Sequence, residues 1–406
     1  MSLNASPQGF AAEPKTRRIS LAILGAEPFR LFFPAGVIAG IIGVALWPLY
    51  FGGVIESYPG QNHAHIMANG MFGSFIFGFL GTAMPRMLSV ARLYFWQTAG
   101  LLAIQLASVA CYAIGNVASG DVLFLLLLIG FVACMALRVP HRKDIPPPGF
   151  VLVAMAFLCL AVGTSIAVIA NFAELDSQTI ALQRLLSYQG FVLLPILGIG
   201  PFLLPRFFGM PSAHDFPESL RASKAWRSKA SLAFAAGALL LVSFVLESRG
   251  WYRLGYGLRF ATTLGYLLLE MPLHRAPKAS NAIGAAVRIA LLGIVLGFLA
   301  VAALPQYRVA LLHLTLIGGF AVIMFTVATR VVFGHSGNLE LLKRRNAWLL
   351  ISIGLMLFGM ATRISGDFMP KLLASHYSYG ALVWIGGVLL WAGFVLPKVF
   401  VAEDEN

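Results

Sequence analysis

Long apolar runs separated by short polar segments dominate this chain, and they predict membrane-spanning helices. A helix needs about 20 apolar residues to cross roughly 30 Å of hydrocarbon, and twelve stretches of the sequence reach that length. The pattern therefore predicts an all-α, polytopic integral membrane protein with twelve transmembrane helices. The predicted spans are residues 31–52, 64–85, 97–116, 121–138, 149–171, 183–205, 230–247, 252–273, 284–303, 308–333, 347–365 and 378–400.

The basic residues of the loops test that count, because short cytoplasmic loops hold an excess of lysine and arginine. With the N-terminus placed inside, most of the 29 lysines and arginines fall on inner segments. The outer side holds only Arg184, Arg249, Arg253, Arg308, Arg363 and Lys371. We therefore expect a cytoplasmic segment at 1–30, a single transmembrane domain at 31–400 and an acidic cytoplasmic tail at 401–406.

Composition agrees with this topology and accounts for the basic charge. The chain is 59% hydrophobic and only 11% charged, so almost no stretch is polar enough to cover a water-facing surface. A net charge of +13 would suggest nucleic-acid binding in a soluble protein. Here the basic residues are spread over loops that face an anionic leaflet, so we expect the lipid bilayer as a partner and no nucleic acid.

Three of the predicted spans, the second, sixth and tenth, end in an arginine followed by a bulky apolar pair. These arginines are Arg86, Arg206 and Arg330, and their spacing is close to four helices. Recurrence at a fixed period is typical of internal repeats. The pattern predicts three four-helix arcs, and the alternative is that arginine is simply common at inner helix ends.

Polar residues recur at one depth in the same three spans. Seventeen residues before each arginine, about 25 Å along a helix, lie Asn69, Gln189 and His313. Arg259, within the eighth predicted span, lies near that level too. Ionisable residues inside a membrane are functional candidates by default. For Arg259 the alternative is a side chain that extends back to the outer interface.

The histidines His63, His65 and His313 lie at a similar depth near the outer mouths of spans two and ten. An imidazole in hydrocarbon costs free energy unless it has a partner, so three at one level predict a haem or metal site. Residues two apart on a helix point about 200° away from each other, so His63 and His65 cannot both ligate one haem. One would share a haem with His313, and the other would serve a second metal, a propionate or a proton path. Ordinary hydrogen bonds between helices are the structural alternative.

Any haem in this chain is expected to be of the non-covalent b type. The cysteines Cys111, Cys134 and Cys159 lie in predicted spans, and the C-x-x-C-H motif for covalent haem attachment is missing from the sequence. Arginines near the predicted site are the expected partners of haem propionates. They are Arg259, Arg184 and Arg308.

His335 belongs to a different part of the molecule. It lies 22 residues beyond His313, about 33 Å along a helix, so the two cannot hold one metal unless the helix is broken. The neighbouring Gly334 and Gly337 indicate a helix C-terminus, where a histidine can cap carbonyl groups. We expect this structural role, with proton entry or a second metal site as the alternative.

Several of these segments resemble the NnrS family. They are Glu27-Pro28-Phe29-Arg30, His63-Ala64-His65-Ile66-Met67, Gly78-Phe79-Leu80-Gly81-Thr82-Ala83, and the stretch from His313 through Arg330 to Gly334-His335-Ser336-Gly337. The resemblance covers the whole chain and implies a bacterial inner-membrane protein with haem and copper, linked to nitric oxide metabolism and nitrosative-stress tolerance. The family commonly has an acidic residue where this chain has Ile66, and a basic one where it has Asn338.

A more distant resemblance connects the twelve-helix arrangement with the catalytic subunit of haem–copper oxidases and nitric oxide reductases. In those proteins helices six and seven would supply a histidine cluster for a second metal. This chain instead has Tyr188 and Gln189, which join Asn69 as candidate catalytic groups. The resemblance implies one or two b-type haems, with copper as a further cofactor.

The sequence thus predicts a haem protein that binds nitric oxide, with its reduction left open as a further activity and with His63, His65 and His313 as ligand candidates. Reduction would need electrons from quinol or another donor, as well as protons. One alternative is a secondary transporter or metal exporter with a polar path through the histidines, Arg259 and Gln189. Another is a haem or nitric oxide sensor without turnover.

Overall fold

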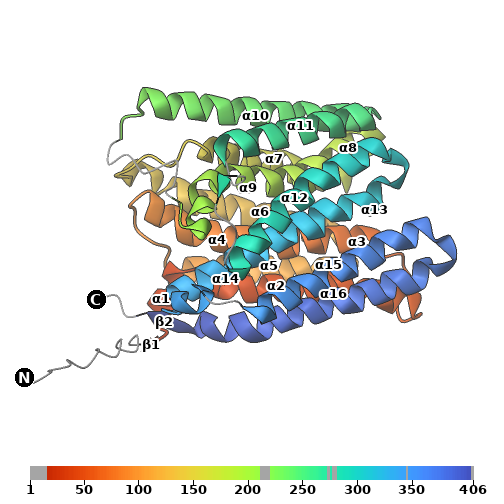
Figure 1. Cartoon of the computed structure of the whole chain (residues 1–406), viewed down its shortest axis with the longest axis horizontal. Coiled ribbons are helices and arrows are strands. Elements are labelled where there is room, and N and C mark those ends of the chain that lie inside the picture. The colour runs from red at the N-terminus through yellow and green to blue at the C-terminus, as the bar shows by residue number, and fades with distance from the viewer. Residues whose placement is uncertain (1–15, 211–219, 272–274, 277–280, 344–345, 404–406) are drawn as a thin grey trace, which may run out of the picture.

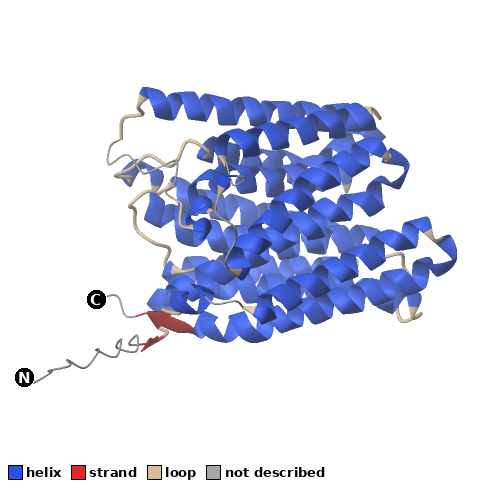
Figure 2. Cartoon of the chain, in the orientation of Figure 1, coloured by secondary structure: helices blue, strands red, loops and turns tan. Residues whose placement is uncertain are grey.

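Long helices lie where the apolar runs predict them, and they pack side by side along one axis (Figure 1). The computed structural model describes residues 16–210, 220–271, 275–276, 281–343 and 346–403. Almost all of this part of the chain is helix joined by short loops (Figure 2). The prediction of an all-α, polytopic membrane protein is confirmed.

Nine of the predicted spans are single α-helices and three are helices with a π-helical segment inside. The single helices are α2 (Phe29–Phe51), α5 (Phe95–Ala113), α6 (Val117–Ala136), α7 (Phe150–Ala170), α10 (Lys224–Ser248), α11 (Tyr252–Glu270), α12 (Ala282–Ala303), α15 (Ala347–Phe368) and α16 (Leu373–Val395). The composite ones are α3 (Gly60–His65) with η1 (Ile66–Phe72) and α4 (Gly73–Met87), α8 (Ser177–Arg184) with η3 (Leu185–Gly190) and α9 (Phe191–Leu203), and α13 (Arg308–His313) with η7 (Leu314–Ala321) and α14 (Val322–His335).

Ten of these helical segments are long and apolar enough to cross a membrane, counted over the described residues. Helices α5 and α11 are not among the ten, although both are 19 residues long. The protein is therefore a multi-pass membrane protein, and the full count of twelve crossings stays a prediction.

The remaining elements are short and lie in the connections. They are α1 (Leu21–Ala26), the 3-10 helices η2 (Val139–His141), η4 (Pro205–Phe208), η6 (Pro305–Tyr307), η8 (Leu339–Lys343), η9 (Pro370–Leu372) and η10 (Leu396–Phe400), and the strands β1 (Thr16–Arg18) and β2 (Val401–Glu403). The two strands pair antiparallel, with Thr16 opposite Glu403. The described ends of the chain therefore meet at one end of the bundle (Figure 1), as an even number of crossings requires.

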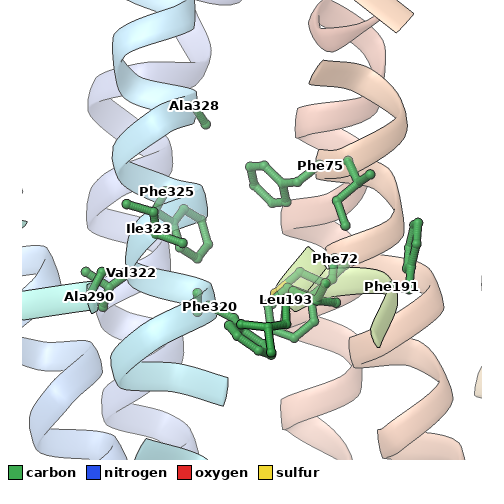
Figure 3. Packing of buried hydrophobic residues seen from close by; sticks show 14 of the residues in the cluster. Phe72, Phe75, Phe191, Leu193, Ala290, Phe320, Val322, Ile323, Phe325 and Ala328 are labelled. Atoms are coloured by element: carbon green, nitrogen blue, oxygen red, sulfur yellow. The ribbon is translucent and has the colours of Figure 1, made fainter. Parts of the chain in front are cut away.

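The second, sixth and tenth spans lie in the interior of the bundle, together with α2. Their apolar windows are 83%, 89% and 67% buried and that of α2 is 67% buried, against 33% for α6 or α15. Aromatic side chains pack between them, as where Phe72 of η1 meets Phe320 of η7 and Phe75 of α4 meets Phe325 of α14 (Figure 3). Because these spans are surrounded by other helices, polar side chains on them face protein rather than lipid.

The π-helical segments occur in these same three spans. A π segment adds one residue to a helical turn, which widens the turn and changes the direction of the side chains that follow, and such segments are frequent at functional sites. In η1 the Gln105 amide of α5 donates hydrogen bonds to the carbonyl oxygens of Asn69 and Gly70 at 2.9 and 3.0 Å. The shared π segments give the three spans a second common feature besides their terminal arginines. The three-arc arrangement itself stays a prediction.

Candidate functional site

His63, His65 and His313 lie at the end of the bundle opposite the described termini, on α3 and α13 (Figure 1). His65 is the last residue of α3 and His313 the last of α13, so each directly precedes a π segment. Spans two and ten thus bring their histidines to the same end of the protein. The structure then separates the three side chains into two surroundings.

His63 and His313 share one of these surroundings. We call these two side chains, together with those of Trp47, Arg363 and Tyr377, the outer crevice, as a name for the group of side chains. The Nδ1 atom of His63 lies 2.9 Å from the Gly43 carbonyl oxygen, and that of His313 lies 2.8 Å from the Val309 carbonyl oxygen. A carbonyl oxygen only accepts, so each Nδ1 carries the proton and each neutral ring keeps its lone pair on Nε2. Within the described chain, neither Nε2 has a hydrogen-bond partner. The Nε2 lone pair of each imidazole is therefore available to bind a metal.

Arg363 of α15 is the cation of the outer crevice. It interacts electrostatically with both His63 and His313, and its guanidinium lies 3.7 Å from the centre of the Tyr377 ring. Its Nη1 is 3.2 Å from an Asp367 oxygen, yet this buried nitrogen makes no well-aligned hydrogen bond to any described residue. A free donor of this kind suits an anionic group such as a haem propionate.

Aromatic rings line the same crevice. The His63 and Trp47 ring centres are 5.6 Å apart, and the Trp47 and Tyr377 ring centres 5.1 Å apart. Tyr377 also donates a hydrogen bond to Asp367. Flat apolar rings beside two imidazoles and a cation form suitable walls for a porphyrin, whose face is apolar and whose edge carries carboxylates.

His65 lies in a separate hydrogen-bonded network. Its Nδ1 is 2.9 Å from the Gln61 carbonyl oxygen, and its Nε2 is 3.4 Å from Asp121 Oδ1. The Tyr188 hydroxyl lies 3.3 Å from Nδ1 and 3.4 Å from Nε2. Asp121 also accepts a hydrogen bond from the Tyr112 hydroxyl at 2.9 Å. Both nitrogens of His65 thus have polar neighbours from the protein.

The three histidines do not form a single cluster. Among the residues that the structure describes, no group of three or more His, Cys, Asp and Glu side chains is placed to hold a metal ion. This separation is compatible with a haem shared by His63 and His313 and with a different role for His65. The ligand roles themselves stay predictions.

Arg259 is completely buried in α11 rather than extended to the outer interface. Its guanidinium lies 2.9 Å from the Glu247 carboxylate and donates to Gln189 Oε1 at 2.7 Å and Ser243 Oγ at 3.1 Å. The ring centre of Tyr256 is 4.4 Å from its guanidinium carbon. Arg259 thus has its counter-ion and hydrogen-bond partners within the protein.

The other two predicted propionate partners lie near the outer surface. Arg308 is 3.9 Å from Glu247 and covers the Tyr252 ring at 4.4 Å, which connects it with the Arg259 group. Arg184 is exposed at the end of α8 and interacts electrostatically with Tyr188. A propionate contact for Arg259, Arg184 or Arg308 stays a prediction.

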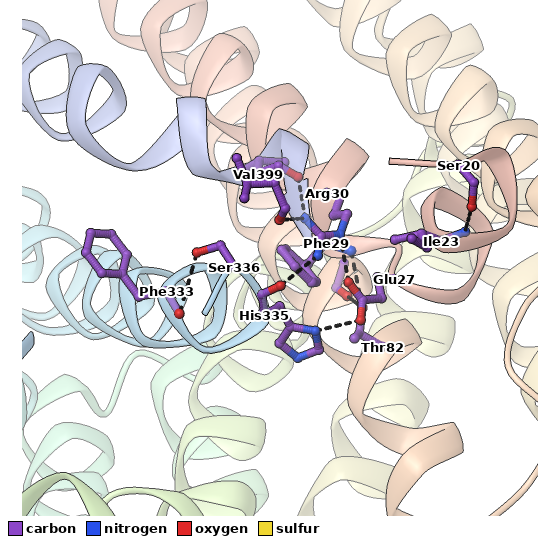
Figure 4. Close-up of polar contacts among 12 residues, drawn as sticks. Ser20, Ile23, Glu27, Phe29, Arg30, Thr82, Phe333, His335, Ser336 and Val399 are labelled. Carbon is purple, nitrogen blue, oxygen red and sulfur yellow. Dashed lines mark hydrogen bonds and ion pairs between the residues drawn. The ribbon is translucent and has the colours of Figure 1, made fainter. Parts of the chain in front are cut away.

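His335 lies at the opposite end of the bundle, in a compact ionic cluster with Glu27, Arg30 and Arg86 (Figure 4). Its Nδ1 is 2.7 Å from Glu27 Oε1 and its Nε2 is 3.2 Å from Arg86 Nη1. A carboxylate only accepts, so Nδ1 of His335 carries the proton that it donates to Glu27. Helix α14 ends at His335 and Gly337 follows at a φ of 70°, as expected for a helix C-terminus.

The same cluster joins two sequence motifs that are 305 residues apart at Arg30 and His335. Arg30 donates to Glu27 at 2.7 Å and to the carbonyl oxygens of His335, Val399 and Val401. Burial raises the pKa of Glu27, but the hydrogen bond and the charge of protonated His335, together with the charge of Arg30, outweigh it and hold the pKa at about 2. The cluster therefore stabilises the junction of both chain ends with spans two and ten.

A comparison with family models matches the NnrS protein family over residues 23–401. The chain belongs to the NnrS family. A search of curated proteins found no match. The NnrS match begins before Glu27 and ends at Val401, so it contains the outer crevice, the His65 network and the ionic cluster. Membership suggests a function in the response to nitric oxide.

Reasoning from the sequence of this NnrS protein missed several residues of these sites, Trp47, Tyr377 and Glu247 among them. Arg363 was counted only as an outer charge, and Asp121 and Tyr112 were given no role. Arg363, Asp121 and Tyr112 are hard to recognise in the sequence, because each is a single polar residue near the end of an apolar run. They belong to these sites because of how neighbouring helices pack, which the sequence alone does not reveal.

Proposed function

We propose that this NnrS-family protein binds a b-type haem in the outer crevice, with His63 and His313 as the iron ligands, and that nitric oxide binds there by replacing one of the two imidazoles. The proposal rests on one observation, that the two imidazoles make the same kind of hydrogen bond. Each donates Nδ1–H to a backbone carbonyl, which is the usual support of a metal-binding histidine. Each leaves Nε2 available for iron.

The remaining residues of the crevice fit the same group. Arg363 would pair with a propionate through Nη1, which lies 3.2 Å from Asp367 but makes no hydrogen bond within the described chain, and Trp47 would pack against the porphyrin. Bound ferrous haem would supply the iron position that nitric oxide occupies. The protein would hold that group between buried spans and exclude water from it.

Turnover and the electron donor belong to the same proposal. Reduction of nitric oxide would require electrons from quinol or another donor together with protons, and copper would serve as a second redox metal. The excess of basic residues on the side of the described termini favours the bacterial inner membrane, with the termini in the cytoplasm and the outer crevice facing the periplasm.

A transporter is the alternative from another functional class. Transporter sites are typically built from helices that unwind near the middle of the membrane. Spans two, six and ten are instead helical throughout, as the ranges Gly60–Met87, Ser177–Leu203 and Pro305–His335 show. Continuous helices with short π segments favour a rigid cofactor site.

Optical spectra of protein purified from haem-replete cells test the proposal. We expect a Soret band in the oxidised and reduced protein, a shift on addition of nitric oxide, and a loss of most of the band in His63→Ala and His313→Ala. His376→Ala is the matched control, because His376 is also half-buried at the outer end but hydrogen-bonds Ser365. A colourless wild type, or equal spectra in all three variants, would refute haem binding at this site.

A further inference from the structure

A cavity lies between the second, sixth and tenth spans, in the half of the bundle nearer the described termini. Its volume is about 80 Å³, and its walls are formed by α4, α9 and α14, with Phe33 of α2. Figure 3 shows two of these walls, with Phe75 on α4 opposite Ile323 and Ala328 on α14. We call this space the central cavity. Ile323 lies ten residues beyond His313, so the cavity is about 15 Å along a helix from the outer crevice.

Every side chain that lines the central cavity is apolar. The lining consists of aliphatic and aromatic residues with methionine, proline and glycine, and none of these residues is exposed. A water molecule needs several polar partners to occupy a buried site, and cavities with apolar walls stay dry. The central cavity therefore suits a small uncharged molecule with little need for hydrogen bonds, and it excludes water and ions.

The three spans present equivalent positions to this cavity. Counted back seven residues from the arginine at the inner end of each span, about two helical turns, the lining residues are Phe79, Ile199 and Ile323. One residue later in each span, the lining residues are Leu80, Gly200 and Met324. Matching faces of the three spans thus converge on one axis. The cavity follows from the arrangement of these spans, and single side chains only adjust its size.

A layer of buried apolar side chains lies between the central cavity and the outer half of the bundle. Phe72 of η1, Leu193 of α9 and Phe320 of η7 meet there (Figure 3), and each is at most 3% exposed. The Phe72 and Phe320 ring centres are 6.2 Å apart. A small neutral molecule can pass such rings when they change rotamer, whereas an ion would lose its hydration there. The layer thus connects the cavity with the outer half for apolar molecules alone.

We propose that the central cavity is a second binding site for a small apolar gas, and that this gas is nitric oxide. The choice of gas rests on the proposed function. Nitric oxide is uncharged and diatomic, so it fits a dry cavity of about 80 Å³. Binding there forms no bond and transfers no electron. Nitric oxide held in the cavity supplies the haem from within the protein, through the layer of Phe72, Leu193 and Phe320.

Xenon tests the cavity without reference to haem, because this atom binds in dry apolar cavities. Crystals of the protein are pressurised with xenon, and its anomalous scattering locates each bound atom. We expect an ordered xenon between α4, α9 and α14 in the wild type. Val327→Phe should remove most of it, since Val327 is half-buried and lines the cavity. A wild type without xenon at this place would refute the proposal.

Two further variants separate filling of the cavity from a general effect on folding. Ile196→Phe enlarges a lining side chain of α9, so it should displace xenon as well, and it decides the test if Val327→Phe does not fold. The control Val245→Phe makes the same change at a position of α10 that is 45% exposed, and it should keep the xenon. Full xenon occupancy in the filled variants would overturn the assignment.

Flash photolysis of the nitric oxide complex of the haem-containing protein then tests the choice of gas. We expect part of the released nitric oxide to rebind in a slow phase whose rate is independent of the free gas concentration. That phase should lose more than half of its amplitude under xenon pressure and in Val327→Phe, and keep it in Val245→Phe. Equal amplitudes in the wild type with and without xenon would overturn nitric oxide binding in the cavity.

The two proposals fail in different ways. Colourless protein with xenon in the central cavity would refute haem binding and leave the gas site intact. Haem-containing protein without xenon there would refute the gas site alone. Continuous density for a lipid chain inside the cavity would make it a lipid site and overturn gas binding.

Discussion

At the residue scale, the charge of Arg259 is compensated almost entirely by one carboxylate. Its guanidinium is fully buried, and Glu247 at 2.9 Å is its acidic partner, itself supported by a hydrogen bond from Tyr256 at 3.0 Å. Removing one member of a buried ion pair leaves the other charged without compensation. The free energy of unfolding therefore depends strongly on Glu247.

Glu247→Gln should lower the free energy of unfolding by about 3–5 kcal/mol, as expected when a buried pair is broken. Thermal unfolding in detergent measures the effect. The control Glu340→Gln breaks the exposed pair with Lys343 and should cost less than about 1 kcal/mol. Equal effects of the two substitutions would show that Arg259 has no need of its counter-ion.

Glu27 gives the ionic cluster a pH dependence with a defined sign. Its pKa of about 2 in the folded protein lies below the usual value of 4.5, so the folded state binds its proton less tightly than the unfolded state. The contribution to stability is complete above pH 4.5 and is lost as the pH falls toward 2. Melting temperatures across this range should fall more steeply for wild type than for Glu27→Gln. Parallel curves would contradict the assignment.

Residues that carry the chemistry were only partly predictable from the sequence. His63, His65, His313 and Arg259 were found, because an ionisable side chain is conspicuous in an apolar run. Their partners depend on which helices are neighbours and how each is rotated. Asp121, for example, contacts His65 from a helix two spans later, and no local pattern contains that information.

At the scale of elements, a π segment follows the outer end of each of spans two, six and ten. Each adds a residue between a histidine or arginine at the outer end and the arginine at the inner end of its span. The backbone carbonyl groups displaced in η1 need new donors, and Gln105 supplies them from α5. The segment therefore depends on a side chain from a neighbouring helix.

Gln105→Leu should destabilise the protein by about 1–3 kcal/mol, the cost of leaving buried polar groups without partners. It should also weaken haem retention, since η1 follows directly after His65. Leu106→Ile, which changes a side chain that is 44% exposed on the same helix, is the control. Unfolding temperature and haem content measured together check both effects, and a Gln105 variant that matches the control would contradict them.

The positions of the helices were predictable because hydrophobic length alone determines them. The predicted span 252–273 corresponds to α11 at Tyr252–Glu270, and 31–52 corresponds to α2 at Phe29–Phe51. The π segments were not predicted, since one additional residue in a turn leaves the apolar pattern unchanged. Regular helix geometry was assumed through 66–72, 185–190 and 314–321, where the structure departs from it.

At the scale of the whole molecule, the pairing of β1 with β2 places the described ends of the chain together. If that end lies in the cytoplasm, as the distribution of basic residues predicts, the outer crevice faces the periplasm. The arrangement of basic loops and access to the outer crevice from the periplasm both depend on this one orientation.

Reporter fusions test the orientation. A reporter after Asn338 should behave as cytoplasmic, and one after Glu174, in the loop between α7 and α8, should behave as periplasmic. Protease accessibility of the two sites in sealed vesicles is the independent measurement. The reverse pattern would place the outer crevice on the cytoplasmic side and contradict the predicted orientation.

The central claim is that His63 and His313 hold a haem, and a cryo-electron microscopy map of the haem-replete protein tests it most directly. The account predicts porphyrin density in the outer crevice, with iron within bonding distance of Nε2 of both imidazoles and a propionate beside Arg363. Density at His65 instead, or a crevice filled only by protein side chains, would contradict it.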